Sequence, residues 1–247
     1  MLAYKAWRES RTRFLVSVAA LVWGCSVVLL IERSVRAQAH PPMIYTHYIW
    51  SAVYKSNSLR DLYLLLVLTL GLGGLLQERV RGTVGFTLAL PVSRSRLVWT
   101  RALVGLVEVT LLACLPAVLL PMGSSFIGER YPAIQAWQFA VLWVAGGGVL
   151  FAIAFVCATQ LSGESSAWVA SFVIVVLYAA LVHLVPALAR VPRLDLFDLM
   201  SGSEMPYFRV ADAALVGLPW GAVAVLAGIT VTILATAALI TTRQEFP

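Results

Sequence analysis

Residues 136–160 read AWQFAVLWVAGGGVLFAIAFVCATQ, a run of 25 residues without a charged side chain. As an α-helix this run would be about 37 Å long, which exceeds the roughly 30 Å of a bilayer's hydrocarbon core. We therefore predict a membrane-spanning helix here. Three consecutive glycines, residues 146–148, lie at its middle. They could form a flexible point, but the pattern favours close contact with neighbouring helices.

Five further apolar runs flank this stretch. Hydrophobic residues make up 60% of the 247 residues and charged residues only 12%, about half the charged share of a soluble domain. Lipid solvates apolar side chains directly, so a membrane protein explains this composition. We predict an all-α membrane protein with six transmembrane helices in one domain over residues 1–247. The further spans are predicted at residues 14–31, 62–76, 102–121, 167–188 and 218–240.

The cations indicate how these spans are oriented. Six spans place both termini on one side, and ten of the 18 Lys and Arg residues fall on that side. The densest clusters, at residues 5–13 and 79–101, adjoin span ends, which is typical of the cytoplasmic side. We therefore predict that both termini are cytoplasmic. Because this orientation explains the formal charge of +6, nucleic acid is not an expected partner.

Three segments outside the spans have their own character. Residues 1–13 alternate charged and apolar side chains and include Trp7. They form either an interfacial helix whose cations face membrane lipids or a plain charge cluster that sets topology. The outside loop 32–60 holds several aromatics without an obvious motif. The outside loop 189–217 mixes apolar and acidic residues at 195–199, which could lay a short helix on the membrane surface.

The loop between the second and third spans is the most informative part of the chain. Residues 77–101 read QERVRGTVGFTLALPVSRSRLVWTR. Residues 83–90 are too apolar for a solvated loop and too short to span, so they need a partner surface or the membrane interface. We read the loop as a short amphipathic helix followed by a turn at Pro91, and we favour a docking element over a simple basic connector.

This loop resembles the signature region of the membrane subunits of type-2 ATP-binding-cassette (ABC) transporters. That family often shows Glu-(Arg/Lys)-x-x-Gly-Thr, an apolar stretch and then Leu-Pro-Val-Ser-Arg. This chain has ERVRGT at residues 78–83 and LPVSR at residues 90–94. The basic N-terminus, the six spans and the long outside loop before the last span are similar too. The chain departs from the family at 199–208, where LMSGSEMPYF replaces a Leu-Ser-Pro-Phe-like run, so the cargo is not identified.

The resemblance implies a permease that is not itself an enzyme. The chain has no Gly-x-x-x-x-Gly-Lys-(Ser/Thr) phosphate loop, so no cofactor is expected on it, and ATP and magnesium are expected on a separate ATPase subunit. Two permease chains, a homodimer or pseudo-dimer, would pair with two ATPase chains in a bacterial inner membrane. The loop would act as a cytoplasmic coupling helix that transmits ATPase closure to the spans. Its expected coupling residues are Glu78, Arg79, Arg81, Gly82, Thr83, Phe86, Leu90, Pro91 and Arg94.

One carboxylate falls inside a predicted span. Glu108 lies seven residues into the third span, where an unpaired charge costs a few kcal/mol. It is either a pathway or gating residue, or a partner in a helix–helix hydrogen bond close to the interface. His40 and His47 share an outside loop, but two histidines do not make a metal site, and we predict neither metal nor catalytic residues.

Two other functions stay open from sequence alone. The chain could be an integral-membrane enzyme acting on lipid-linked substrates, with Glu108 and His183 as candidates. These two residues are expected nearer opposite sides of the membrane, which argues against their meeting. The chain could also be a non-catalytic membrane assembly subunit.

Overall fold

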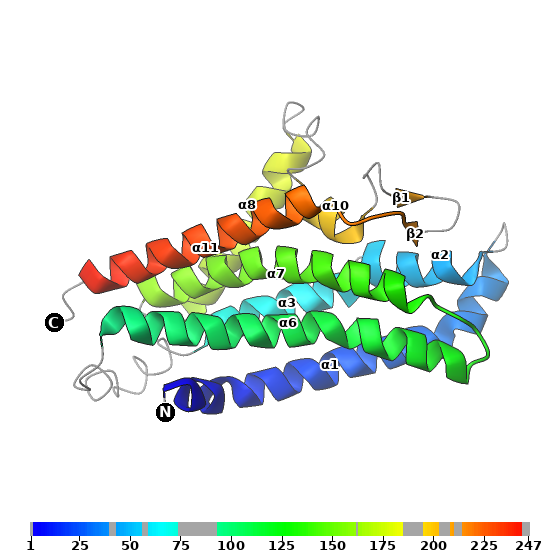
Figure 1. Cartoon of the computed structure of the whole chain (residues 1–247), viewed down its shortest axis with the longest axis horizontal. Coiled ribbons are helices and arrows are strands. Elements are labelled where there is room, and N and C mark those ends of the chain that lie inside the picture. Colours follow the sequence, from blue (N-terminus) through cyan, green and yellow to red (C-terminus); the bar gives the residue numbers. More distant parts are fainter. Residues whose placement is uncertain are drawn as a thin grey trace.

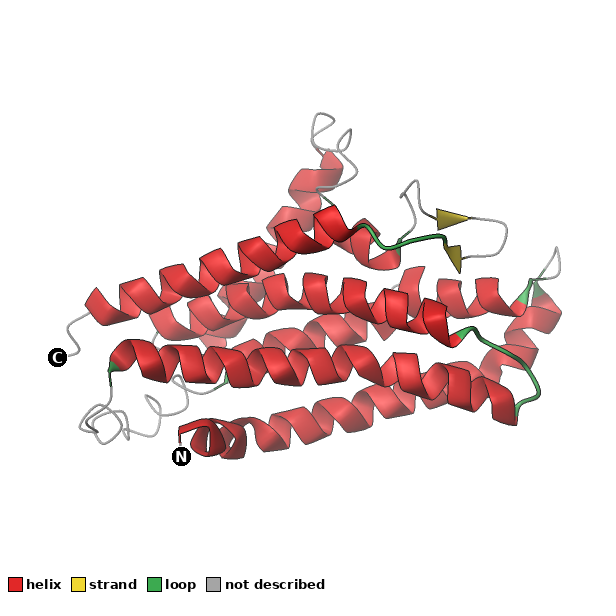
Figure 2. Cartoon of the chain, viewed as in Figure 1, coloured by secondary structure: helices red, strands yellow, loops and turns green. Residues whose placement is uncertain are grey.

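Where the computed structural model describes the chain, its regular structure is helical apart from one short strand pair (Figure 2). It describes residues 2–39, 43–55, 59–73, 93–161, 163–184, 195–202, 208–209 and 214–243. The helices are α1 (Leu2–Gln38), α2 (Tyr45–Ile49), the π-helix η1 (Trp50–Lys55), α3 (Leu59–Gly71), α6 (Arg94–Phe126), α7 (Ala133–Gln160), α8 (Glu164–Leu184), α10 (Leu196–Ser201) and α11 (Trp220–Arg243). Strands β1 (Phe208–Arg209) and β2 (Ala214–Leu215) pair antiparallel.

Five helices in the described ranges are long and apolar enough to cross a membrane: α1, α6, α7, α8 and α11. Each contains most of one predicted span. The predicted second span, residues 62–76, corresponds to α3, which has 13 residues and is only about 20 Å long. The structure therefore shows an all-α chain with five candidate spans, and the sixth span, predicted at residues 62–76, stays a prediction. Helix α1 begins and helix α11 ends at the same end of the bundle (Figure 1).

The first helix is longer than predicted. Residues 2–13, expected to be either an interfacial helix or a plain charge cluster, continue without a break into α1, which has 37 residues. Residues 2–38 contain no proline and only one glycine, Gly24, so no residue in this range breaks the helix. A helix of this length measures about 55 Å, so its charged ends extend beyond a hydrocarbon core of about 30 Å.

Part of the predicted outside loop 32–60 is helical and buried. Tyr48, Trp50 and Tyr54 are each at most 4% exposed. The Tyr48 hydroxyl donates to the Val28 carbonyl at 2.6 Å, and Trp50 Nε1 donates to the Ser201 carbonyl at 2.9 Å. Residues 45–55 of the predicted loop are thus helical, and their buried aromatics pack into the core.

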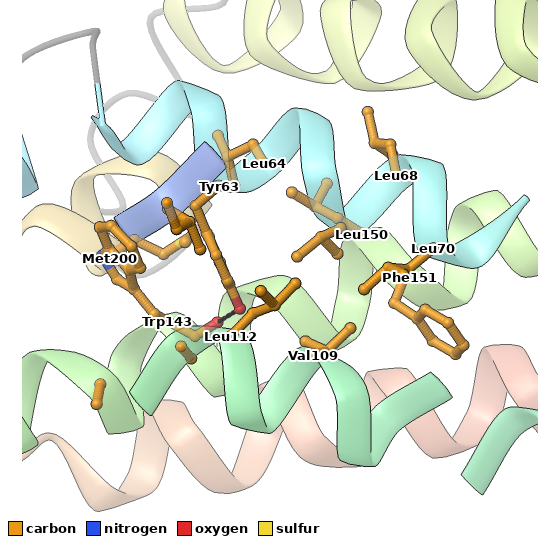
Figure 3. Packing of buried hydrophobic residues seen from close by; sticks show 14 of the residues in the cluster. Tyr63, Leu64, Leu68, Leu70, Val109, Leu112, Trp143, Leu150, Phe151 and Met200 are labelled. Carbon is orange, nitrogen blue, oxygen red and sulfur yellow. Dashed lines mark hydrogen bonds between the residues drawn. The ribbon is translucent and has the colours of Figure 1, made fainter. Parts of the chain in front are cut away.

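Helix α7 lies at the centre and contacts α6, α11, α3 and α8. It is uninterrupted through the glycine triplet, and all three glycines are buried. A Cβ atom at Gly147 would overlap the Tyr63 hydroxyl, which donates to the Trp143 carbonyl at 3.0 Å (Figure 3). A Cβ atom at Gly146 would overlap Met200 of α10. The packing interpretation of the triplet is thus confirmed.

The short helix expected near residues 195–199 is present, but it docks on the bundle. Asp195 caps α10, because its Oδ1 accepts from the backbone N–H groups of Phe197 and Asp198 at 2.8 and 3.2 Å. Leu199 and Met200 are at most 1% exposed, and α10 contacts α7 and η1. Its apolar face is therefore buried against protein rather than turned toward a membrane surface.

Candidate functional site

The predicted coupling segment joins α3 to α6. Residues 74–92 lie outside the described residues, whereas its flanks are described: α3 ends at Gly71 and α6 begins at Arg94, one residue after its N-cap, Ser93. Helix α6 starts at the end of the bundle that also holds both termini (Figure 1). The predicted coupling residues outside the described ranges are Glu78, Arg79, Arg81, Gly82, Thr83, Phe86, Leu90 and Pro91.

Next to this segment, polar side chains join α1 to α6. Ser10 and Glu108 are hydrogen-bonded through Oγ and Oε1, and Glu108 is 1% exposed. Arg101 Nη2 lies 3.1 Å from Glu9 Oε2, and Lys5 Nζ lies 3.9 Å from the other oxygen of Glu9. Arg101 and Glu108 are seven residues apart, so both face α1. Of the roles predicted for Glu108, the structure shows the helix–helix hydrogen bond.

A small cavity adjoins these contacts. Its volume is about 30 Å³, and residues of α1, α3, α6 and α7 line it. The polar ones are Glu9, Ser10, Arg101 and Glu108. This volume suffices for one or two water molecules, since one water needs about 10–15 Å³, but it is far below the roughly 300 Å³ of a small ligand pocket. The cavity can therefore hold water or a proton, not a transported molecule.

Of the alternative enzyme site, the side chain of His183 lies outside the described residues. The lining of the Glu108 cavity includes no described residue of α8, the helix that carries residue 183. His47 packs edge-on against Trp50, with ring centroids 5.4 Å apart, while His40 lies outside the described residues. Among the described residues no three His, Cys, Asp or Glu side chains could hold a metal ion together.

The opposite end of the bundle holds an ion network that the sequence interpretation missed. Arg36 pairs with Glu32 on its own helix and lies 2.6 Å from Glu129 of the α6–α7 connection. The Tyr45 hydroxyl lies 2.5 Å from Ser124 Oγ beside it. The four-residue spacing of Glu32 and Arg36 is a helical pair signal that was available in the sequence. Glu129 is 93 residues from Arg36 in the sequence, so their contact could be found only from the fold.

The ion pair between Glu9 and Arg101 leads to a prediction about stability. Changing Glu9 to Gln is expected to lower the free energy of unfolding by about 2 kcal/mol, because a buried cation loses its carboxylate partner. The side chain of Arg101 is 7% exposed in this pair. The measurement is thermal unfolding of the purified protein in detergent.

The matched control is Glu129→Gln at the other end. The Glu129 side chain is 37% exposed, so this change should cost less than about 1 kcal/mol. If Glu9→Gln unfolds at the same temperature as Glu129→Gln, the Glu9–Arg101 pair does not stabilise the α1–α6 contact.

No protein-family model matches the chain. No curated protein matches it either.

Proposed function

We propose that this chain is the membrane permease subunit of an ATP-driven ABC exporter. Two permease chains, identical or related, work with two separate ATPase subunits that bind and hydrolyse ATP. The observation that carries this proposal is the sequence of residues 78–94, placed between two helices of a multi-pass bundle. The segment is apolar at its centre and basic at both ends, as a docking element for a protein partner requires.

The described helices suit a coupling role. The 33 residues of α6 start directly after the segment and run on to Phe126 at the opposite end of the bundle. A displacement of the segment would therefore pass along one continuous helix. Near its start, α6 is tied to α1 by the Glu9–Arg101 pair and the Ser10–Glu108 hydrogen bond. In the proposed cycle α1 and α6 move together when the ATPase subunits close.

The proposed orientation places both termini and residues 74–92 in the cytoplasm of a bacterial cell, with the chain in the inner membrane. It predicts the accessibility of two exposed serines at opposite ends of the bundle, Ser125 and Ser166. In a variant whose native cysteines are replaced by alanine, Ser125→Cys should react with an impermeant maleimide added to intact cells. Ser166→Cys should react only after permeabilisation. The reverse pattern would show that the chain inserts the other way round.

Co-purification tests the proposal. An affinity-tagged chain, co-expressed with the ABC ATPase encoded nearest to it, should retain the ATPase subunit through purification in detergent. A chain that inserts stably but retains no ATPase subunit would exclude the function. An assembly subunit would bind partners without moving cargo, so the purified complex should also be tested for ATP-dependent transport in vesicles.

A further inference from the structure

The Ser10 hydroxyl lies near three possible hydrogen-bond acceptors but has only one hydrogen to donate. Its Oγ lies 3.2 Å from the Ala6 carbonyl oxygen and 3.3 Å from that of Trp7, and it is also hydrogen-bonded with Glu108 Oε1. A serine hydroxyl has one hydrogen to donate and can accept two. At most one of the three contacts can therefore use the hydrogen of Ser10.

A proton on Glu108 resolves this competition. The carboxyl O–H then donates to Ser10 Oγ, and Ser10 donates to a carbonyl of its own helix. Without the proton, Ser10 must turn its hydrogen to Glu108 Oε1. The second oxygen, Oε2, is buried with no hydrogen-bond partner among the described residues in either state, so an ionised carboxylate would keep part of its charge there without compensation. A buried carboxylate in that state bears a large desolvation cost.

The charged groups around Glu108 have other partners. On α1, Glu9 faces Lys5 and Arg101, while Arg13 Nη1 donates to the Thr69 carbonyl at 3.3 Å. On α6, Arg101 is the cation that lines the cavity. Among the described residues, α3 contributes Leu70 to this lining, Gly73 just after α3 also lines the cavity, and α7 contributes Phe151 and Phe155, so none of these is charged. Within the described ranges no cation lies within 4 Å of the Glu108 carboxylate.

We propose that Glu108 is a proton-binding site in the interior of the bundle. At neutral pH its carboxyl group holds one proton and uses it in the hydrogen bond that joins α6 to Ser10 of α1. Loss of the proton places a negative charge in a cavity of about 30 Å³, and the hydrogen bond between the two helices then persists only with Ser10 as its donor. The inference concerns this chain alone and does not depend on the proposed transport function.

Infrared spectroscopy of the purified full-length chain at neutral pH tests the proposal. The wild-type protein should show the carbonyl band of a protonated carboxylic acid, with the small shift in D₂O that an exchangeable proton gives. Glu108→Gln should lose this band. The control Glu32→Gln, which removes a carboxylate that is 3% exposed but paired with Arg36, should keep it.

A second variant decides the matter if Glu108→Gln does not fold. Ser10→Ala leaves Glu108 in place and removes its hydrogen-bond acceptor, so the band should remain but change frequency. The proposal is overturned if the wild-type protein lacks the band, if the band survives in a folded Glu108→Gln variant, or if Ser10→Ala leaves its frequency unchanged.

Discussion

Under the proposed function, replacing Phe86 with Asp is expected to abolish the ATP hydrolysis that depends on complex formation between this chain and the proposed ATPase subunit. Phe86 lies at the centre of the apolar segment 83–90. Removing one central aromatic anchor from a protein interface costs about 2 kcal/mol or more, which weakens binding by more than about tenfold. A carboxylate at the same position adds a desolvation cost. The measurement is the ATPase rate of the co-expressed complex in detergent or vesicles.

The matched control is Ile134→Asp at the start of α7. Ile134 is 68% exposed and is the second residue of α7, which begins at the end of the bundle opposite the start of α1 (Figure 1). This variant introduces the same charge on an apolar position and should leave the ATPase rate unchanged. Both variants should insert into the membrane in equal amounts. A wild-type rate in Phe86→Asp would mean that the segment does not couple the two subunits.

Replacing Gly71 with Ala is expected to lower the free energy of unfolding of the bundle. A Cβ atom at Gly71 would lie 2.6 Å from Ala154 Cβ and 2.8 Å from the Phe151 carbonyl oxygen of α7. Neither atom can move by a side-chain rotation, so α3 must shift away from α7. Overpacking of this kind costs about 1–3 kcal/mol. Thermal unfolding in detergent measures the loss.

Gly228→Ala in α11 is the control for this change, because a Cβ atom there would meet nothing within 4 Å. Helix propensity alone predicts that Gly228→Ala is neutral or stabilising by up to about 1 kcal/mol. Equal unfolding temperatures for the two variants would show that α3 does not pack closely on α7 at Gly71.

The long helices could be predicted because their signal is local. The uncharged run 136–160 lies within α7, whose bounds are Ala133–Gln160, and the run 218–240 corresponds to α11 at Trp220–Arg243. Hydrophobicity sustained over 20 or more residues identifies such helices without knowledge of their neighbours. The glycine triplet also indicated close packing before its neighbours were known.

The two short helices between α1 and α3, α2 and η1, were harder to predict. Tyr45, Tyr48 and Ile49 have the spacing of one helix face and are all at most 4% exposed, so a periodicity signal was available in the sequence. It was missed because α2 is only five residues long and continues as a π-helix. Hydropathy alone does not distinguish such a segment from an aromatic-rich loop.

The contacts of the candidate site depend on the fold. The depth of Glu108 in its span could be estimated from sequence, but its partner Ser10 is 98 residues away. Arg101 and Glu9 are 92 residues apart. Ser10, Glu9 and Arg101 are unremarkable beside the end of a span, and only the packing of α1 on α6 brings them to one cavity.

The central claim is that residues 83–90 dock on an ATPase subunit, and site-specific photo-crosslinking tests it most directly. A photoreactive amino acid is placed at position 86 in one sample and at position 134 in another, each in the co-expressed complex. The proposed function predicts a covalent adduct with the ATPase chain from position 86 and none from position 134. An intact complex that gives no adduct from position 86, or as much adduct from position 134, would contradict it.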